Sequence, residues 1–365
     1  MYNMDKLFEA VVARGHVCVG LDTALEYLPD FQPPAKPAEA ASASDAPSAS
    51  EAAASILAFN KAIIDATIDI AACFKVQIAY YEEMGIAGLD CYARTLSYLR
   101  EKGALIIADI KRSDIADTAS RYARAHFSGD FEADFVTLNP YLGMDSLEPW
   151  LHWADNKGKG AFVLMRTSNK GRHDFQLQNL EGGEASPPLA PEPLRNFTKR
   201  EEPSSRSVSY ATPPPGGDAP KPPRLLCDVV GERLTELTAA RLGKHSYGAF
   251  GAVVGVDSQS PTEREAAIAI RARYPNLFFL IPGYGTQGGG AEDAALLLRE
   301  GNGGVVNASR SILLAWRNSV QGAASDSDIA KADLSFAAEA ARKATIEMRD
   351  AILAACGRTA CGPTS

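Results

Sequence analysis

The segment that decides the fold is residues 105–126, which read LIIADIKRSDIADTASRYARAH. Its first part, residues 105–110, is an apolar run with one charge, typical of a parallel strand that helices cover on the outside. Residues 113–126 then show the apolar spacing of an amphipathic helix. A strand followed directly by a helix is the repeating unit of α/β folds.

The strand-helix unit recurs along the whole chain. The predicted strands are 17–21, 73–77, 105–110, 135–138, 162–165, 252–256, 277–281 and 304–307. The predicted helices are 55–70, 91–101, 113–126, 147–156, 228–242, 262–273, 291–300 and 328–354. Eight alternating pairs predict a closed α/β fold, the (β/α)8 TIM barrel. An open doubly wound sheet is the alternative, but it usually has fewer strands and often a glycine-rich turn after the first one, where this chain has GLDT at 20–23.

Two low-complexity segments interrupt the pattern. Residues 32–54 are mostly Ala, Ser and Pro, and residues 182–223 are rich in Pro, Ser, Glu and Gly. Such compositions bury too little apolar area to offset the entropy of ordering, so both are predicted to be disordered surface insertions. We therefore expect one barrel domain over 1–320, a C-terminal helix packed on it over 321–355, and a flexible tail over 356–365.

Composition and charge narrow the class of protein. The 365 residues are 46% apolar, which is enough for a large core, and the net charge of −8 argues against a nucleic-acid partner held by positive charge. Six cysteines form no CxxC pair or zinc-spaced cluster, which predicts reduced thiols. Residues 1–12 are amphipathic and unlike a targeting peptide, and no apolar run approaches the about 20 residues of a membrane span. We expect a cytoplasmic protein without a membrane partner.

Charged side chains gather where the second and third predicted strands end. Active sites of (β/α)8 barrels lie at these carboxyl ends. Asp109 and Lys111 are two apart and should face the same side, with Ile110 turned into the helix layer. Lys75 ends the preceding strand and Asp114 follows at the turn, which predicts an alternating row of Lys75, Asp109, Lys111 and Asp114. A surface salt-bridge cluster is the alternative reading of a lone Asp-x-Lys, but the complete string at this place favours a site.

A second candidate site follows the last two predicted strands. Residues 282–290 read PGYGTQGGG, and residues 307–310 read NASR. Loops after the seventh and eighth strands commonly bind phosphate in this fold, because glycines let backbone N–H groups approach the anion. Arg310 adds a fixed positive fork. A flexible glycine loop with a surface arginine is the alternative, but their joint occurrence favours a phosphate site.

These segments resemble the orotidine 5′-phosphate decarboxylase family, in its longer bacterial-type branch. The signature Asp-x-Lys-x-x-Asp of that family appears as DIKRSD at 109–114. The resemblance runs over about residues 7–314 outside the two insertions. Further similar segments are VGLD at 19–22, FKVQIAYYE at 74–82, NPYLG at 139–143, TSN at 167–169 and the 282–290 loop. No single segment is specific, but their combination is.

The resemblance implies decarboxylation of orotidine 5′-monophosphate to uridine 5′-monophosphate, in pyrimidine biosynthesis, with no metal and no cofactor. It implies that Lys111 protonates C6 after CO2 leaves, and that Asp109 crowds the substrate carboxylate. A fixed ammonium beside C6 also makes physical sense, because it stabilises the developing carbanion. The implied catalytic residues are Lys111, Asp109, Asp114 and Lys75.

The resemblance also implies how the nucleotide is bound. Lys75 and Asp22 contact ribose hydroxyls, Ser168 the pyrimidine edge, and Arg310 the phosphate. Gln287 bridges base and phosphate. Asp114, Ile115 and Thr118 are donated across a dimer interface, which implies an obligate homodimer with shared active sites. The implied substrate-binding residues are Asp22, Ile115, Thr118, Asn139, Ser168, Gln287, Gly288 and Arg310.

The chain departs from the family pattern after the sixth predicted strand, where Gly255-Val256-Asp257 replaces the usual Gly-Ala-Thr. A carboxylate near a phosphate is unfavourable, so Asp257 is not a candidate site residue. Two other functions stay open. A metal-dependent sugar-phosphate decarboxylase of the same superfamily needs an acidic ligand near the second strand, where Lys75 stands and Glu82 and Glu83 follow. The other is a catalytically silent nucleotide-binding barrel.

Overall fold

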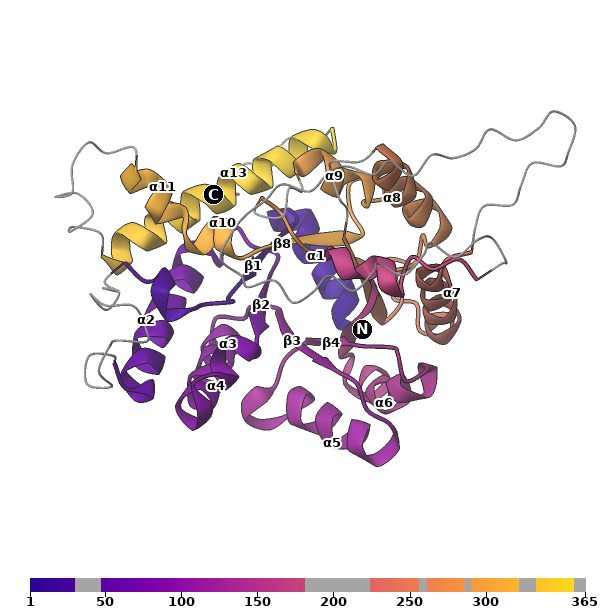
Figure 1. Ribbon diagram of the computed structural model, residues 1–365, viewed down its shortest axis with the longest axis horizontal. Coiled ribbons are helices and arrows are strands. Elements are labelled where there is room, and N and C mark those ends of the chain that lie inside the picture. The colour runs from indigo at the N-terminus through magenta and orange to yellow at the C-terminus, as the bar shows by residue number, and fades with distance from the viewer. Residues whose placement is uncertain (30–46, 181–223, 256–260, 286–289, 322–332, 358–365) are drawn as a thin grey trace, which may run out of the picture.

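The computed structural model describes residues 1–29, 47–180, 224–255, 261–285, 290–321 and 333–357. Its eight parallel strands form a closed barrel in sequence order, and β1 pairs with β8 to complete the ring. The predicted (β/α)8 barrel is therefore confirmed (Figure 1). The strands are β1 (Val17–Gly20), β2 (Cys73–Gln77), β3 (Ile106–Arg112), β4 (Phe135–Leu138), β5 (Gly160–Arg166), β6 (Phe250–Val254), β7 (Phe279–Ile281) and β8 (Gly304–Ala308).

The strands match the predicted apolar runs with ends that differ by two residues or fewer. Almost all their residues are buried, because one face fills the barrel and the other meets the helices. Lys111, near the end of β3, is the one residue of the described strands that is exposed to solvent. Of the predicted sixth strand, residue 256 lies outside the described residues.

Helices surround the barrel as the alternation predicts (Figure 1). The α-helices are α1 (Asn3–Arg14), α2 (Ala49–Thr67), α3 (Ala79–Glu82), α4 (Gly85–Glu101), α5 (Ala116–Phe127), α6 (Glu148–Lys157), α7 (Leu226–Thr238), α8 (Pro261–Arg273), α9 (Ala291–Leu296), α10 (Arg310–Leu313), α11 (Ala315–Gln321) and α13 (Leu334–Ala355). Short 3-10 turns are η1 (Leu25–Tyr27), η2 (Gly129–Phe131), η3 (Met144–Leu147) and η4 (Lys170–Asp174). All eight predicted helices are present, but α4 begins six residues before the predicted start and α7 and α9 end four residues early.

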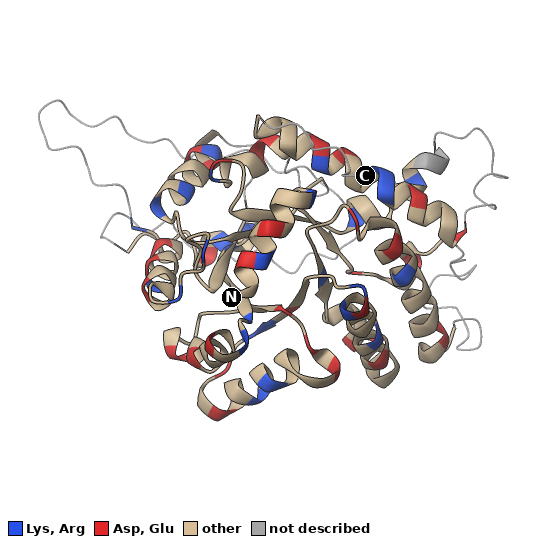
Figure 2. Ribbon diagram, turned by 180° about the vertical axis from the view of Figure 1, so that it is seen from behind, with Lys and Arg blue, Asp and Glu red and all other residues tan. Residues whose placement is uncertain are grey.

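Helix α1 covers the amino-terminal end of the barrel. Its Met4, Leu7 and Val11 belong to one buried cluster with Phe135 and Phe162, which lie near the amino-terminal ends of β4 and β5. Seen from behind in Figure 2, this helix crosses the barrel next to the N-terminus. The amphipathic character of residues 1–12 indicated its buried face, although no helix was predicted there. With this end closed, the carboxyl ends of the strands are the open mouth.

The predicted insertion 32–54 is wrong at its C-terminal end, because residues 49–54 form the first turns of α2. Ser48 caps this helix: its hydroxyl accepts a hydrogen bond from the Glu51 N–H at 3.3 Å, and the Glu51 carboxylate accepts one from the Ser48 N–H at 2.8 Å. Ala52 and Ala53 are buried, so small residues here serve packing. Residues 32–46 and the second predicted insertion, 182–223, lie outside the described residues.

The C-terminal helix α13 packs along α2 and α9 to α11, as Figure 1 shows. It begins at Leu334, six residues after the predicted start. Asp333 caps it, because its carboxylate accepts a hydrogen bond from the Phe336 N–H at 2.9 Å. Arg342 donates to the Ala66 carbonyl of α2 at 2.7 Å and forms an ion pair with Asp69, in the loop after α2, at 2.6 Å. The tail from 358 onward lies outside the described residues. Among the described helices, none combines the length and apolarity needed to cross a membrane.

Candidate active site

Two adjoining cavities open at the carboxyl ends of the strands. The polar cavity, of about 380 Å3, is lined among others by Asp22, Tyr27, Tyr80, Tyr284, Ser309 and Arg310. The apolar cavity, of about 230 Å3, is lined among others by Lys111, Thr137, Leu164, Ser168, Val253 and Leu280. Four residues line both cavities, namely Lys75, Asp109, Pro282 and Asn307. Of the charged residues predicted from the sequence, Lys75 and Asp109 therefore lie where the two cavities meet, and Lys111 lines the apolar cavity.

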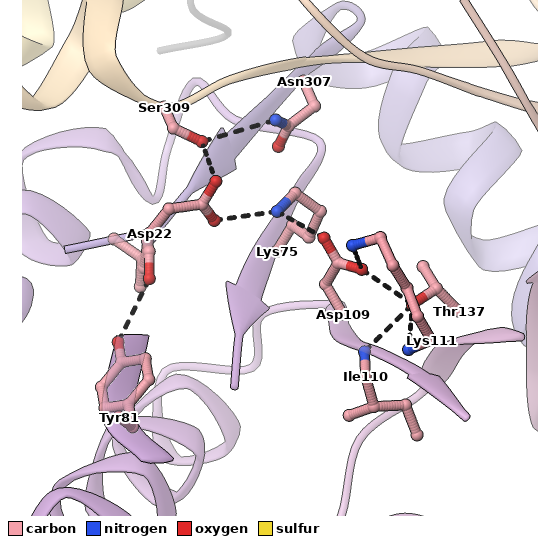
Figure 3. A network of polar contacts seen from close by, with 10 residues as sticks. Asp22, Lys75, Tyr81, Asp109, Ile110, Lys111, Thr137, Asn307 and Ser309 are labelled. Carbon is pink, nitrogen blue, oxygen red and sulfur yellow. Dashed lines mark hydrogen bonds and ion pairs between the residues drawn. The ribbon is translucent and has the colours of Figure 1, made fainter. Parts of the chain in front are cut away.

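A row of alternating charges crosses this meeting point (Figure 3). The Lys75 ammonium donates to Asp22 Oδ1 at 2.8 Å and to Asp109 Oδ2 at 2.9 Å. The Lys111 ammonium donates to the other oxygen, Asp109 Oδ1, at 2.6 Å. The Ile110 side chain points away from these charges and is buried among the helices, as predicted from the strand alternation. The row is thus Asp22, Lys75, Asp109 and Lys111.

Mutual pairing keeps the buried members of this row charged. Lys75 and Asp109 are each 5% exposed. Burial alone lowers the pKa of a lysine, but the carboxylates of Asp109 and Asp22 outweigh it and raise the pKa of Lys75 above its usual value. Burial alone raises the pKa of a carboxyl group, but the ammonium groups of Lys75 and Lys111 hold the pKa of Asp109 well below its usual range. Lys111 lines the apolar cavity, and its side chain, at 45% exposure, is the most exposed of the row.

The end of β3 is irregular at this point. Its pairing with β4 skips between Ala108 and Arg112, and Lys111 adopts a φ of +45°, which is rare for a residue with a side chain. The hydroxyl of Thr137 on β4 accepts hydrogen bonds from the N–H groups of Ile110 and Lys111, both at 3.0 Å. The bulge orients the Lys111 side chain so that its ammonium reaches the Asp109 carboxylate.

The ends of β1 and β8 hold Asp22 from the other side. The Ser309 hydroxyl donates to Asp22 Oδ2 at 2.8 Å, so both carboxylate oxygens have partners. Ser309 passes so close to Gly20 that a Cβ there would lie 2.0 Å from its oxygen. A glycine at position 20 is therefore required for this contact. Asn307 lies beside Ser309, and its Oδ1 is buried with no hydrogen-bond partner among the described residues.

The polar cavity suits an anion with hydroxyl groups. Arg310 begins α10 after β8 and is exposed at the cavity, in the predicted place. Tyr27 and Tyr284 line the same cavity, and burial raises the pKa of both, so their hydroxyls stay protonated as donors. Of the predicted phosphate loop, Gln287 and Gly288 lie outside the described residues, as does Asp257.

The apolar cavity suits a flat ring. Leu164, Val253 and Leu280 supply its apolar walls, and Ser168 with its neighbours Thr167 and Asn169 supplies a polar edge after β5. Gln176 clamps that edge, accepting from the Thr167 N–H at 2.8 Å and donating to the Thr167 hydroxyl at 2.9 Å. Ser168 thus has the predicted position at one end of a ring-sized slot.

Four predicted residues line neither cavity within this one chain. Asp114 does not join the charge row as predicted: its carboxylate accepts from the N–H of Ile115 at 2.9 Å, because β3 ends at Arg112 and the chain turns away toward α5. Ile115 and Thr118 are exposed on the outside. The Asn139 side chain accepts from the Tyr141 N–H at 3.0 Å and shapes the loop after β4.

Sequence reasoning missed several lining residues. Thr137 is the one polar residue of the β4 run FVTL, which is a visible signal, but its partners depend on strand register. Tyr27 and Tyr80 come from short turns with no periodic pattern. Ser309 and Asn307 were noted as part of NASR, but no role was predicted for either.

Comparisons with known proteins agree with this geometry. The sequence pattern of the orotidine 5′-phosphate decarboxylase / HUMPS family matches residues 15–185. The chain is similar to the orotidine 5′-phosphate decarboxylase of Clostridium perfringens (strain SM101 / Type A), with 46% identity over 95% of this chain and 97% of the relative. The enzyme of that name from Clostridium acetobutylicum is 43% identical, over 96% of this chain and 98% of the relative. Among solved structures, Leishmania donovani OMP decarboxylase superposes with a TM-score of 0.60 at 26% identity, covering 98% of this chain and all of that one.

Proposed function

Since the chain belongs to the orotidine 5′-phosphate decarboxylase family, we propose that it is a carboxy-lyase that converts orotidine 5′-monophosphate to uridine 5′-monophosphate in cytoplasmic pyrimidine biosynthesis. The single observation that carries this proposal is the ammonium of Lys111. It lines the ring-sized apolar cavity and is held 2.6 Å from Asp109, which lies at the junction with the polar cavity that Arg310 lines. A nucleotide occupies two such spaces naturally, with its base in one and its phosphate in the other.

The reaction uses Lys111 in two ways. When the bond between C6 and the carboxylate breaks, CO2 leaves and the electron pair stays on C6. The ammonium of Lys111 stabilises that charge and then gives C6 a proton, after which solvent reprotonates the amine. Asp109 lies beside the departing carboxylate and keeps Lys111 in place through its ion pair. Because Asp109 is already negative, its repulsion of the substrate carboxylate is relieved when CO2 leaves.

The remaining roles follow the two cavities. Arg310 binds the phosphate together with Gly288, and Gln287 bridges the base and the phosphate. Ser168 binds the edge of the pyrimidine, whose ring lies between the apolar walls. Asp22 and Lys75 meet the ribose hydroxyls in the polar cavity. Binding energy from the remote phosphate then helps to hold C6 against the lysine.

We further propose a homodimer in which Asp114, Ile115 and Thr118 complete the partner's active site, with Asn139 as a further binding residue. Ile115 is 51% exposed, and Tyr141 and Phe175 from neighbouring loops are also exposed, which leaves an apolar surface beside the mouth of the barrel. A mixture of Lys111→Ala and Asp114→Asn proteins tests the sharing. If sites are shared and subunits exchange freely, an equimolar mixture regains about a quarter of wild-type activity, because about half of its dimers are mixed and one of the two sites in each mixed dimer is intact. Two inactive variants that stay inactive after mixing contradict it.

The experiment that tests the activity is an absorbance assay of the purified protein with orotidine 5′-monophosphate, with and without EDTA. Turnover that survives EDTA supports the proposal. Turnover lost on chelation and restored by a divalent metal favours a metal-dependent sugar-phosphate decarboxylase. The structure gives this alternative no support at Glu82, a candidate acidic ligand, because Glu82 pairs with Arg112 at 3.2 Å and is not among the residues that line either cavity. Binding of the nucleotide without turnover favours a silent barrel.

A further inference from the structure

We propose that Thr137 is a positioning residue for this reaction: its hydroxyl fixes the backbone under Lys111 and the orientation of the Asp109 carboxylate. The inference rests on the proposed decarboxylation. Thr137 lies inside β4, lines the apolar cavity and is 2% exposed. Its hydroxyl bonds the backbone N–H of Lys111 and the side chain of Asp109, so it acts on the reaction through these two residues (Figure 3).

The hydrogen bonds of Thr137 leave its hydroxyl a single orientation. Its oxygen accepts from the N–H groups of Ile110 and Lys111, each at 3.0 Å, which uses both lone pairs. The hydroxyl proton is then directed to Asp109 Oδ1 at 2.8 Å. One side chain thus satisfies two neighbouring backbone donors and supports the carboxylate with its only proton.

The two backbone donors converge because β3 is irregular there. Strand pairing joins Ala108 to Val136 and Arg112 to Leu138, so Thr137 alone faces the three intervening residues of β3. Lys111 adopts its positive φ within this bulge. Left-handed backbone at a residue with a side chain persists only where the surroundings hold it, and here the Thr137 oxygen is the group that holds it.

The same carboxylate oxygen receives both Thr137 and Lys111. Asp109 Oδ1 accepts the hydroxyl at 2.8 Å and the ammonium at 2.6 Å, while Oδ2 accepts Lys75. Removing the hydroxyl frees the carboxylate to rotate and the bulge to relax, so the Lys111 ammonium moves away from the place where C6 is to be protonated. A displacement of about 1 Å can cost about 100-fold in rate.

The test compares three variants at position 137. Thr137→Val keeps the shape without the hydroxyl, Thr137→Ser keeps the hydroxyl, and Thr137→Ala removes both the hydroxyl and the methyl group. Thr345→Val is the matched control, because Thr345 is a fully buried threonine in α13 whose hydroxyl donates to the Ala341 carbonyl of its own helix, at 2.7 Å. Each protein is assayed for kcat and KM with orotidine 5′-monophosphate, and for the Kd of uridine 5′-monophosphate.

The expected result is a fall in kcat of about 10- to 100-fold in Thr137→Val, with the Kd of uridine 5′-monophosphate within about 3-fold of wild type. Thr137→Ser should recover kcat to within about 5-fold, and Thr345→Val should change the melting temperature without changing kcat. If Thr137→Val does not fold, Thr137→Ser must still exceed Thr137→Ala in kcat by about 10-fold.

Two results overturn the inference. One is a Thr137→Val enzyme with wild-type kcat. The other is a loss of kcat and nucleotide affinity together that Thr137→Ser shares, which indicates a role in packing alone. Both require an active wild-type protein. A wild-type protein that does not turn over orotidine 5′-monophosphate contradicts the proposed function instead.

Discussion

The buried pair of Lys75 and Asp109 should be strongly coupled in stability. Asp109→Asn removes one of the two carboxylates that hold the Lys75 ammonium, whose side chain is 6% exposed. Removing one partner of a buried ion pair typically costs about 3–5 kcal/mol, because the other charge is left uncompensated. Lys75 keeps Asp22 at 2.8 Å, and the Lys111 side chain is 45% exposed to water. We therefore expect a lower cost, about 2–4 kcal/mol.

A double-mutant cycle measures this coupling directly. The variants are Asp109→Asn, Lys75→Met and the combination of the two, and the free energy of unfolding is obtained from urea denaturation at pH 7. The combined variant should be less destabilised than the sum of the single variants by at least about 1 kcal/mol, because it leaves no unpaired charge between these positions. Additivity to within about 0.5 kcal/mol would refute the electrostatic account of the charge row.

Three further predictions concern the phosphate, acid stability and a close contact. Arg310→Ala should raise KM by about 10- to 100-fold through lost charge-assisted hydrogen bonds, with kcat at saturation nearly unchanged; steady-state kinetics that show a fall in kcat alone contradict the phosphate assignment. Because the folded pKa of Asp109 lies below its unfolded value of about 3.9, its contribution is present above that pH and lost as the pH falls. The difference in unfolding free energy between wild type and Asp109→Asn should therefore shrink below about pH 4, and a difference that grows there contradicts the pairing. Gly20→Ala should cost about 1–3 kcal/mol by overpacking against Ser309, and adding Ser309→Ala should recover part of the loss in thermal melts.

The sequence predicted the barrel well because its strands are buried on both faces. Such strands appear as short apolar runs, and the runs ended within two residues of the strands. Helix ends were predicted less well. Helix α2 begins at Ala49, inside a stretch whose Ala- and Ser-rich composition resembles disorder. The capping box of Ser48 and Glu51 was the available signal, and it outweighs composition because it satisfies otherwise unpaired N–H groups.

The charge row was predicted in part, and the missing part is physically instructive. Strand alternation correctly places Asp109 and Lys111 on one side, but it does not reveal the bulge between them. The bulge depends on Thr137, which meets β3 only once the register of β4 is known. Similarly, Asp22 joins the row because β1 lies beside β2 in the closed barrel. Contacts of this kind are set by tertiary pairing, which spacing along one segment does not contain.

The most direct test of the account is the Lys111→Ala enzyme. Lys111 lies at the solvent-facing end of the charge row, so its removal should leave the barrel folded and the buried pair of Lys75 and Asp109 intact. The measurement is turnover of orotidine 5′-monophosphate beside the Kd of uridine 5′-monophosphate on the same sample. We predict no detectable decarboxylation, with nucleotide binding retained. Turnover near that of the wild type would contradict the claim that this ammonium protonates C6.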